Sequence, residues 1–183
     1  PPAFRARLSE IAALMTFSAT THLPVREVSM WTPLEETRCR VLAAPVTVVP
    51  ILRAGLAMAD GVLTVFPEAR IGHLGLARDE ETLQPVAYLD RLPRDIDAGP
   101  VLAVDPMLAT GGSAIAALRT LRAAGAKHVV FVCLVAAPEG VVNLQNADPD
   151  VIIHVAALDR QLNEKGYILP GLGDAGDRAF GTI

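Results

Sequence analysis

The stretch Val101-Leu102-Ala103-Val104-Asp105-Pro106-Met107-Leu108-Ala109-Thr110-Gly111-Gly112-Ser113 decides the fold of this chain. Apolar residues lead to a lone aspartate, a turn rich in glycine and hydroxyl groups follows, and a helix-forming run extends from Ala114 to Ala124. This order predicts a strand, a tight turn and a helix. Because the first N–H groups of a helix lack partners within the helix and its dipole is positive there, such a turn is suited to hold an anion.

The residue types in this turn narrow the choice of anion. Thr110 and Ser113 add hydroxyl donors, and Gly111 and Gly112 let the backbone approach a phosphate closely. The Gly-x-x-x-x-Gly-Lys-Ser/Thr loop of ATP and GTP hydrolases is absent from the sequence. A carboxylate such as Asp105 can accept hydrogen bonds from two vicinal hydroxyls, so ribose phosphate is the ligand that the pattern favours. The alternative is an ordinary strand-to-helix turn that is capped by Ser113.

The pattern along the chain predicts an α/β fold, with a parallel sheet flanked by helices in one domain over residues 1–183. Apolar and β-branched runs predict strands at residues 47–52, 69–77, 100–105, 129–137 and 151–156. Helices are expected at residues 4–20, 56–65 and 113–124 and after Pro138, an edge strand at 25–32, and a projecting hairpin or loop at 79–93. Right-handed crossovers would place ligands outside the carboxyl ends of the strands.

Composition excludes several classes of protein. The chain is 51% hydrophobic but only 4% aromatic, which favours a core of Val, Leu, Ile and Ala in buried parallel strands. A net charge of −4 without a Lys/Arg cluster argues against nucleic acid as a partner. No signal peptide or membrane-spanning run occurs, so we expect a cytoplasmic protein without a membrane partner. The two cysteines, Cys39 and Cys133, and the four histidines show no metal-ligand spacing, and Cys133 is expected to be a buried thiol.

The turn after Asp105 and the run Tyr167-Ile168-Leu169-Pro170-Gly171-Leu172-Gly173-Asp174-Ala175-Gly176-Asp177-Arg178 closely resemble the uracil phosphoribosyltransferase family. Three further segments look like the same family: Val49-Pro50-Ile51-Leu52-Arg53-Ala54-Gly55-Leu56, Ala77-Arg78-Asp79-Glu80-Glu81-Thr82 and Val135-Ala136-Ala137-Pro138-Glu139-Gly140. The resemblance runs from about Phe4 to the C-terminus. It implies transfer of the phosphoribosyl group of 5-phosphoribosyl-1-diphosphate (PRPP) to N1 of uracil, giving UMP and diphosphate in pyrimidine salvage.

The resemblance also assigns roles to residues. It implies that Arg53 and Arg78 bind the diphosphate, that Asp105 binds the ribose diol, and that Asp174 faces PRPP. Arg53, Asp105 and Asp174 are thus the candidate catalytic residues. The remaining PRPP-binding candidates are the residues of the turn, Pro106, Met107, Leu108, Ala109, Thr110, Gly111, Gly112 and Ser113. In the hood, which we define as residues 167–178, the main chain of Ile168, Gly173 and Ala175 would contact uracil together with Asp174.

No residue is expected to bind a metal directly, because Mg²⁺ would be carried mainly by the oxygens of PRPP and by water. The resemblance further implies a homodimer or a higher homo-oligomer, a GTP activator, and an N-terminal extension that is absent from this sequence.

The segment Asp79-Glu80-Glu81 is either a solvated acidic loop or a flap that closes on PRPP. Two other readings stay open, an RNA-binding nucleotide sensor, against which the acidic balance counts, and a catalytically weak chain.

Some residues depart from family patterns or allow two readings. Ala77 stands where many relatives carry an aromatic residue. Pro106 stands where many ribosyltransferases carry a second acid, but the uracil family shares this difference, so it supports the resemblance. The run Gly171-x-Gly173-x-x-Gly176 matches the dinucleotide fingerprint formally, but it lies too close to the C-terminus to open a βαβ unit. Tyr167 either packs on the base or fills the hood. Asp177 and Arg178 either form a local ion pair, or Arg178 contacts substrate.

Overall fold

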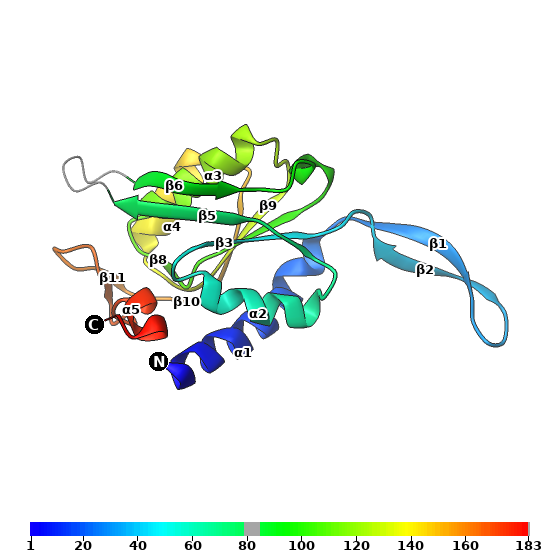
Figure 1. Cartoon of the computed structure of the whole chain (residues 1–183), viewed down its shortest axis with the longest axis horizontal. Coiled ribbons are helices and arrows are strands. Elements are labelled where there is room, and N and C mark those ends of the chain that lie inside the picture. Colours follow the sequence, from blue (N-terminus) through cyan, green and yellow to red (C-terminus); the bar gives the residue numbers. More distant parts are fainter. Residues whose placement is uncertain (79–84, 183) are drawn as a thin grey trace.

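The centre of the molecule is a mixed sheet with the strand order β10-β9-β7-β3-β5-β6. The computed structural model describes residues 1–78 and 85–182 (Figure 1). The strands of this path are β3 (Thr47–Leu52), β5 (His73–Arg78), β6 (Pro85–Arg91), β7 (Val101–Val104), β9 (Val129–Ala136) and β10 (Ile152–Leu158). Two short strands join the sheet, β4 (Arg70–Ile71) beside β3 and β8 (Met107–Leu108) beside β9. Every pair is parallel except β5 with β6.

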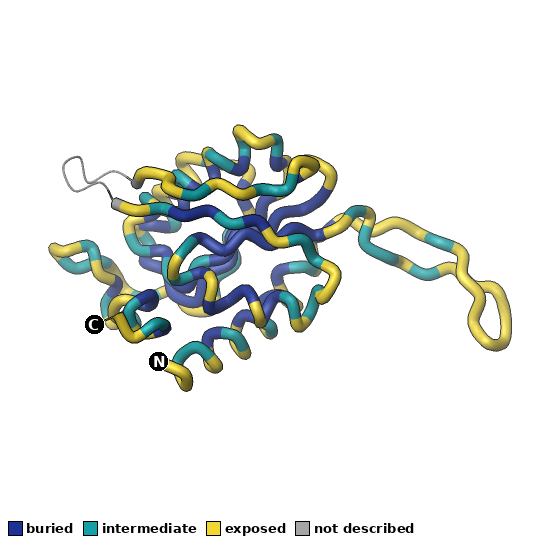
Figure 2. Tube along the Cα trace, viewed as in Figure 1, coloured by how far each residue is buried: buried dark blue, intermediate teal, exposed yellow. Residues whose placement is uncertain are grey.

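Helices cover both faces of this sheet. Side chains alternate along a strand, so neighbouring residues enter different cores. Val48 and Leu102 pack in the core that includes residues of α1 (Pro2–Ala19) and α2 (Leu56–Val65). Val49 and Ala103 pack in the core that includes residues of α3 (Gly112–Ala123) and α4 (Pro138–Ala147). The inner strands are therefore buried on both sides (Figure 2), which confirms the α/β class.

The boundaries of the central elements confirm the sequence predictions closely. The strand at 47–52 and the helix at 56–65 occupy these residues, and Pro138 lies in the first turn of α4. The strand expected at 69–77 consists of two pieces, β4 and β5, which are separated by Gly72. Cys133 is fully buried and free, and burial raises the pKa of its thiol. No helix in the described parts of the chain combines the length and the apolar character that crossing a membrane requires.

The edge strand expected at residues 25–32 is confirmed, and it lies outside the central sheet. β1 (Val25–Trp31) pairs with β2 (Glu36–Leu42) in a separate antiparallel sheet, which we call the hairpin arm, and this arm projects from the body (Figure 1). The sequence analysis missed β2 because its residues are mostly polar and exposed, so they lack the alternation of a half-buried strand. The turn between the strands is closed by the Thr32 hydroxyl, which accepts hydrogen bonds from the N–H groups of Leu34 and Glu35.

The segment at 79–93, for which a hairpin or a loop was expected, contains a hairpin strand. β6 pairs antiparallel with β5 at the edge of the sheet, with a register shift at Gly75/Leu76. The acidic residues Asp79, Glu80 and Glu81 of the expected flap lie outside the described residues.

The two ends of the chain lie side by side (Figure 1). The hood contains β12 (Ile168–Leu169), which pairs with β11 (Gln161–Leu162), and most of α5 (Ala175–Phe180). Arg5 of α1 donates from Nη1 to the Ala179 carbonyl over 2.6 Å. The Arg178 guanidinium lies 4.1 Å from the centre of the Phe4 ring, which is cation–π geometry. α1 therefore fastens α5 to the body.

A close contact between α1 and α2 gives a test of this packing. A Cβ on Gly61 would lie 2.1 Å from the Ser9 carbonyl oxygen, so Gly61→Ala forces the two helices apart. We expect the free energy of unfolding to fall by about 1–3 kcal/mol, as for other overpacked cores, in denaturant titrations. Gly112→Ala is the matched control, because its nearest neighbour would be 3.7 Å away. Equal stability of both variants would contradict the close packing of α1 on α2.

Candidate active site

A pocket of about 270 Å³ opens at the carboxyl ends of the strands. It lies where β3 and β7 adjoin, and the helices that follow these strands, α2 and α3, enter different cores. In open α/β sheets this divergence leaves a crevice beyond the strand ends. The lining residues are Ala54, Asp105, Met107, Leu108, Ala109, Thr110, Gly111, Gly112, Ser113, Ala114, Lys165, Gly166, Tyr167, Gly173, Asp174, Ala175 and Gly176.

The turn before α3 forms one side of the pocket. Gly111 is the N-cap residue with φ 87°, a left-handed conformation that favours glycine, and α3 begins at Gly112. No side chain caps this helix, and Ser113 is exposed, so the alternative of a turn capped by Ser113 is wrong. The Thr110 hydroxyl accepts from the Gly112 N–H over 3.4 Å, and Asn143 of α4 donates to the Thr110 carbonyl over 3.0 Å. α4 therefore supports the turn from outside the pocket.

Asp105 follows β7 and stands between the turn and the hood. Its Oδ1 accepts one long hydrogen bond, of 3.4 Å, from the Met107 N–H. Burial raises the pKa of this carboxyl from 3.8 to about 7, the Met107 N–H opposes the rise, and the charge of Asp174 adds to it. A carboxylate that is desolvated to this degree gains most when a ligand supplies hydrogen-bond donors.

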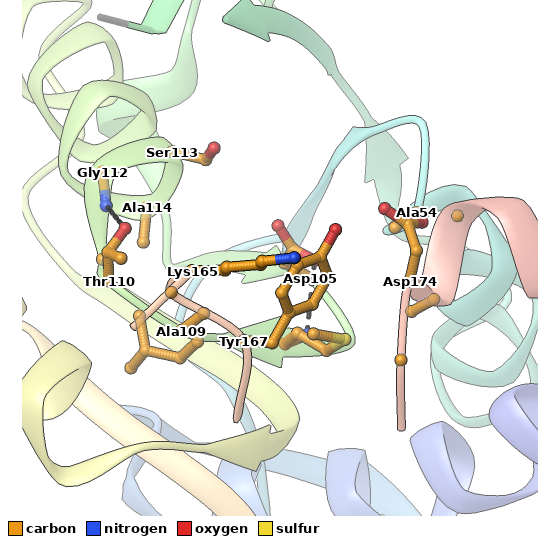
Figure 3. Close-up of a pocket in the computed structure, with 17 residues that line it drawn as sticks. Ala54, Asp105, Ala109, Thr110, Gly112, Ser113, Ala114, Lys165, Tyr167 and Asp174 are labelled. Atoms are coloured by element: carbon orange, nitrogen blue, oxygen red, sulfur yellow. Dashed lines mark hydrogen bonds between the residues drawn. The ribbon is translucent and has the colours of Figure 1, made fainter. Parts of the chain in front are cut away.

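The hood forms the other side of the pocket. Asp174 is the N-cap residue of α5, and its Oδ1 accepts from the Asp177 N–H over 2.9 Å. Gly173, Ala175 and Gly176 line the pocket beside it. In Figure 3, Thr110, Gly112 and Ser113 stand on one side, Asp174 stands on the other, and Asp105 lies between them.

Sequence reasoning missed Lys165, which contributes a cation to the pocket, and Gly166 beside it. These residues lie in the turn between β11 and β12. The Asn163 carboxamide oxygen fixes this turn, because it accepts from the N–H groups of Lys165 and Tyr167, each over 2.9 Å. The polar run Asn163-Glu164-Lys165-Gly166 directly before the hood is the signal that indicates such a turn.

Three of the predicted site residues, Pro106, Ile168 and Arg53, do not line the pocket. Pro106 and Ile168 are buried, Ile168 within the core on the α1/α2 side. Arg78 is the last residue of β5, at the carboxyl end of a strand that neighbours β3. Arg53 follows β3, next to the pocket-lining Ala54.

Of the two readings left open for Asp177 and Arg178, the structure excludes the local ion pair. Asp177 pairs instead with Arg53, with 3.2 Å between Oδ1 and Nη2. Arg178 donates from Nη1 to the Leu172 carbonyl over 2.7 Å and stacks on Phe4. Asp177 therefore pairs with a residue that is distant in sequence, and Arg178 contacts the nearby Leu172 carbonyl and the distant Phe4 ring.

Among the residues that the structure describes, no three His, Cys, Asp or Glu side chains are grouped closely enough to hold a metal ion. Burial lowers the pKa of His154, and the neighbouring His22 lowers it further. The pocket itself combines two carboxylates, one lysine and the N–H groups at the start of α3. Such a site can bind a ligand with an anionic group at one end and hydroxyl groups near its middle.

Comparison with known proteins places the chain in a family. A family model described as uracil phosphoribosyltransferase matches residues 1–182. The uracil phosphoribosyltransferase of Dictyoglomus thermophilum is 55% identical over 183 residues, which cover 100% of this chain and 88% of that protein. That of Bacillus licheniformis is 56% identical over 180 residues, which cover 98% of this chain and 86% of that protein.

Solved structures agree with this placement. The AQ2163 protein from Aquifex aeolicus superposes with a TM-score of 0.90 at 39% identity, over 97% of this chain and 86% of that chain. A hypoxanthine-guanine phosphoribosyltransferase from Bacillus anthracis has a TM-score of 0.57 at 11% identity, over 87% of this chain and 80% of that chain, so it shares the fold alone. On the family model and the full-length identity, the chain belongs to the uracil phosphoribosyltransferase family.

Proposed function

We propose that this chain, as one domain over residues 1–183, transfers the phosphoribosyl group of PRPP to N1 of uracil and releases UMP and diphosphate. Family membership supports the reaction. The observation that carries the proposal is the order of groups across one pocket, with helix N–H groups at one side, Asp105 in the middle and the hood backbone at the other side.

PRPP fits this order of groups. The 5′-phosphate would receive hydrogen bonds from the turn, residues 110–113, which lines the pocket at the N-terminus of α3. Asp105 would accept from the ribose hydroxyls, and residues 107–109 would form the floor beside the sugar. Arg53 and Arg78 would bind the diphosphate from the carboxyl ends of β3 and β5, where charge-assisted donors stabilise a departing anion.

Uracil would bind under the hood through main-chain groups. Its two carbonyls and two N–H groups match alternating backbone donors and acceptors, which Ile168, Gly173 and Ala175 would supply. Asp174 would align the base with PRPP, and the half-exposed Tyr167 ring would pack beside the base. Cytosine presents an amino group where uracil has a carbonyl, so a backbone N–H would lose its partner.

In the reaction, the bond from C1 of the ribose to the diphosphate oxygen breaks, the bond from C1 to N1 of uracil forms, and the N1 proton is released to water. The diphosphate leaves with its electron pair, so the pocket acts mainly by orienting the reactants and by stabilising negative charge. Mg²⁺ would neutralise charge on the PRPP oxygens. The ion would arrive with PRPP and retain several waters, as is usual for Mg²⁺.

The proposal predicts UMP formation from uracil, PRPP and Mg²⁺. Cytosine, hypoxanthine and orotate serve as parallel substrates, and product is measured by chromatography. We expect UMP from uracil and a rate with cytosine that is lower by about 5- to 150-fold, because one unpaired buried polar group costs about 1–3 kcal/mol. A parallel series with GTP tests the activation that the resemblance implies. Equal rates with cytosine would contradict base recognition by the main chain.

The buried carboxyl of Asp105 should lower the stability of the protein at neutral pH, although the proposed activity requires it. Because its pKa rises from 3.8 to about 7 on folding, the folded chain keeps a proton that the unfolded chain releases between these values. The free energy of unfolding contributed by this group is therefore lost as the pH rises from about 4 to about 7. Asp105→Asn should be more stable than the wild type at about pH 8, and this difference should shrink at about pH 4.5.

The same variant should lose activity. Hydrogen bonds to a charged group contribute about 1.5–3 kcal/mol, so kcat/KM for PRPP should fall by about 10- to 100-fold. Thermal unfolding at both pH values and initial rates measure the two effects. Asp150→Asn, an exposed carboxylate outside the pocket, is the control. A stability difference that does not depend on pH would contradict the burial of the Asp105 carboxylate.

We further propose that the hairpin arm packs against a second copy of this chain. A two-stranded hairpin alone is marginally stable in water, yet this one carries Val25, Met30, Trp31 and Leu34 exposed, with Trp31 75% and Leu34 92% accessible. Burial of apolar side chains of this size against a partner lowers the free energy of the system. The projecting shape of the arm (Figure 2) suits a clasp around a neighbouring body.

Trp31 is the single tryptophan of the chain and reports on this contact. We expect light scattering to give a dimer or a higher oligomer, and the tryptophan emission to shift to shorter wavelengths as the protein concentration rises. The double variant Trp31→Ser/Leu34→Ser should be monomeric, because it removes the two most exposed apolar side chains of the arm. Val142→Ser, on the exposed side of α4, is the control for loss of an apolar side chain. A monomeric wild type would overturn the proposal.

A further inference from the structure

The side chain of Arg53 is held by the C-terminal part of the chain. Its Nη2 lies 3.2 Å from Asp177 Oδ1, and its Nη1 lies 3.5 Å from the Thr182 hydroxyl. The Thr182 hydroxyl in turn donates to Asp177 Oδ1. Two neighbouring acceptors therefore fix one edge of the guanidinium, and within the described residues its other N–H donors have no acceptor.

Asp177 connects two residues of the site by different groups. Its backbone N–H donates to Asp174 Oδ1 over 2.9 Å, and its side chain binds Arg53. Its support is rigid, because α5 is fastened to α1 by the Arg5–Ala179 hydrogen bond and by the stacking of Arg178 on Phe4. Asp177 thus sets the position of Arg53 relative to Asp174.

We propose that Asp177 is a positioning residue, which holds the guanidinium of Arg53 at the pocket rim in readiness for the diphosphate of PRPP. The inference rests on the proposed function, since that function assigns the diphosphate to Arg53. A free arginine has many rotamers and loses their entropy when it binds, whereas an arginine that is already fixed has lost it on folding. Asp177 therefore acts on the binding of PRPP and not on the base.

The energetic scale of this effect follows from exposure. The side chain of Arg53 is 56% exposed and that of Asp177 is 22% exposed, so the Coulomb attraction between them is screened by water. Pairs of this kind contribute at most about 1 kcal/mol, which corresponds to about a fivefold change in an equilibrium constant. The contribution of Asp177 is therefore mainly geometric. Removal of its carboxylate should weaken the binding of PRPP modestly and leave the binding of uracil unchanged.

A purely structural role of Asp177 predicts a different outcome. Asp177→Ala keeps the backbone N–H that binds Asp174, so the N-cap contact of α5 stays intact. Asp177→Asn keeps an oxygen that can accept from Arg53 and Thr182. A general loosening of the hood would raise the KM values of uracil and PRPP together, whereas misplacement of Arg53 would raise that of PRPP alone.

The test is steady-state kinetics of UMP formation with the full chain. For Asp177→Ala we expect the KM for PRPP to rise by about two- to fivefold, with the KM for uracil, kcat and Tm close to wild type. Asp177→Asn should restore most of the PRPP affinity. Asp60→Ala, which removes an exposed carboxylate on α2 outside the pocket, is the control for net charge.

A double-mutant cycle separates positioning from an independent effect. In the Arg53→Ala background, Asp177→Ala should change the KM for PRPP no further, because the group that it positions is gone. An additive effect, an unchanged or lowered KM for PRPP in the single variant, or a parallel rise for uracil would each overturn the inference.

Direct binding of PRPP, measured by calorimetry, keeps this inference distinct from the proposed function. If the wild type binds PRPP but makes no UMP, the proposed reaction is wrong. The inference is then tested by binding alone: weaker PRPP binding by Asp177→Ala than by the wild type supports it, and equal binding overturns it. If the wild type binds no PRPP, both are overturned.

Discussion

Burial of the strands β3, β7 and β9 on both faces is the constraint on which the rest of the structure depends. A strand between two helical layers can carry almost no polar side chain, and Thr47 is the one buried polar residue on these strands. Polar chemistry is therefore confined to the positions where the strands end. Arg53, Asp105 and the turn before α3 occupy such positions, and the raised pKa of Asp105 reflects how close it lies to the apolar interior.

The hood forms the side of the pocket that the strand ends leave open. It contributes irregular backbone and Asp174, and α4 and α1 support the site from outside the pocket. Asn143 of α4 binds the turn before α3, and Glu139 accepts from the Leu162 N–H, which lowers the pKa of its carboxyl. A site that combines helix N–H groups, one partly desolvated carboxylate and main-chain groups needs few charged side chains, which agrees with an acidic chain that binds an anionic substrate.

The sequence predicted the parts of the fold that depend on local pattern and missed those that depend on tertiary partners. The runs at 47–52 and 56–65 have clear periodicity and punctuation by glycine, and their boundaries agree with the structure. β2 was missed because an exposed strand leaves no pattern of burial. The partner of Asp177 could not be predicted, because Arg53 is 124 residues away in sequence and spacing alone carries no information at that range. Lys165 was missed because its turn is defined by hydrogen bonds to Asn163 and not by a motif.

The contact between α1 and α5 has a kinetic consequence. Arg5 and Ala179 are separated by 174 positions along the chain, so their hydrogen bond can form only after nearly the whole polypeptide has been brought together. Contacts of such high order carry the largest loop-closure entropy and develop late in folding. The sheet and its flanking helices can therefore assemble before the hood docks, and an intermediate of this kind has the turn before α3 in place but no lid over it. On the proposed assignment of ligands, affinity for the nucleobase is the last to appear during folding, later than affinity for phosphate.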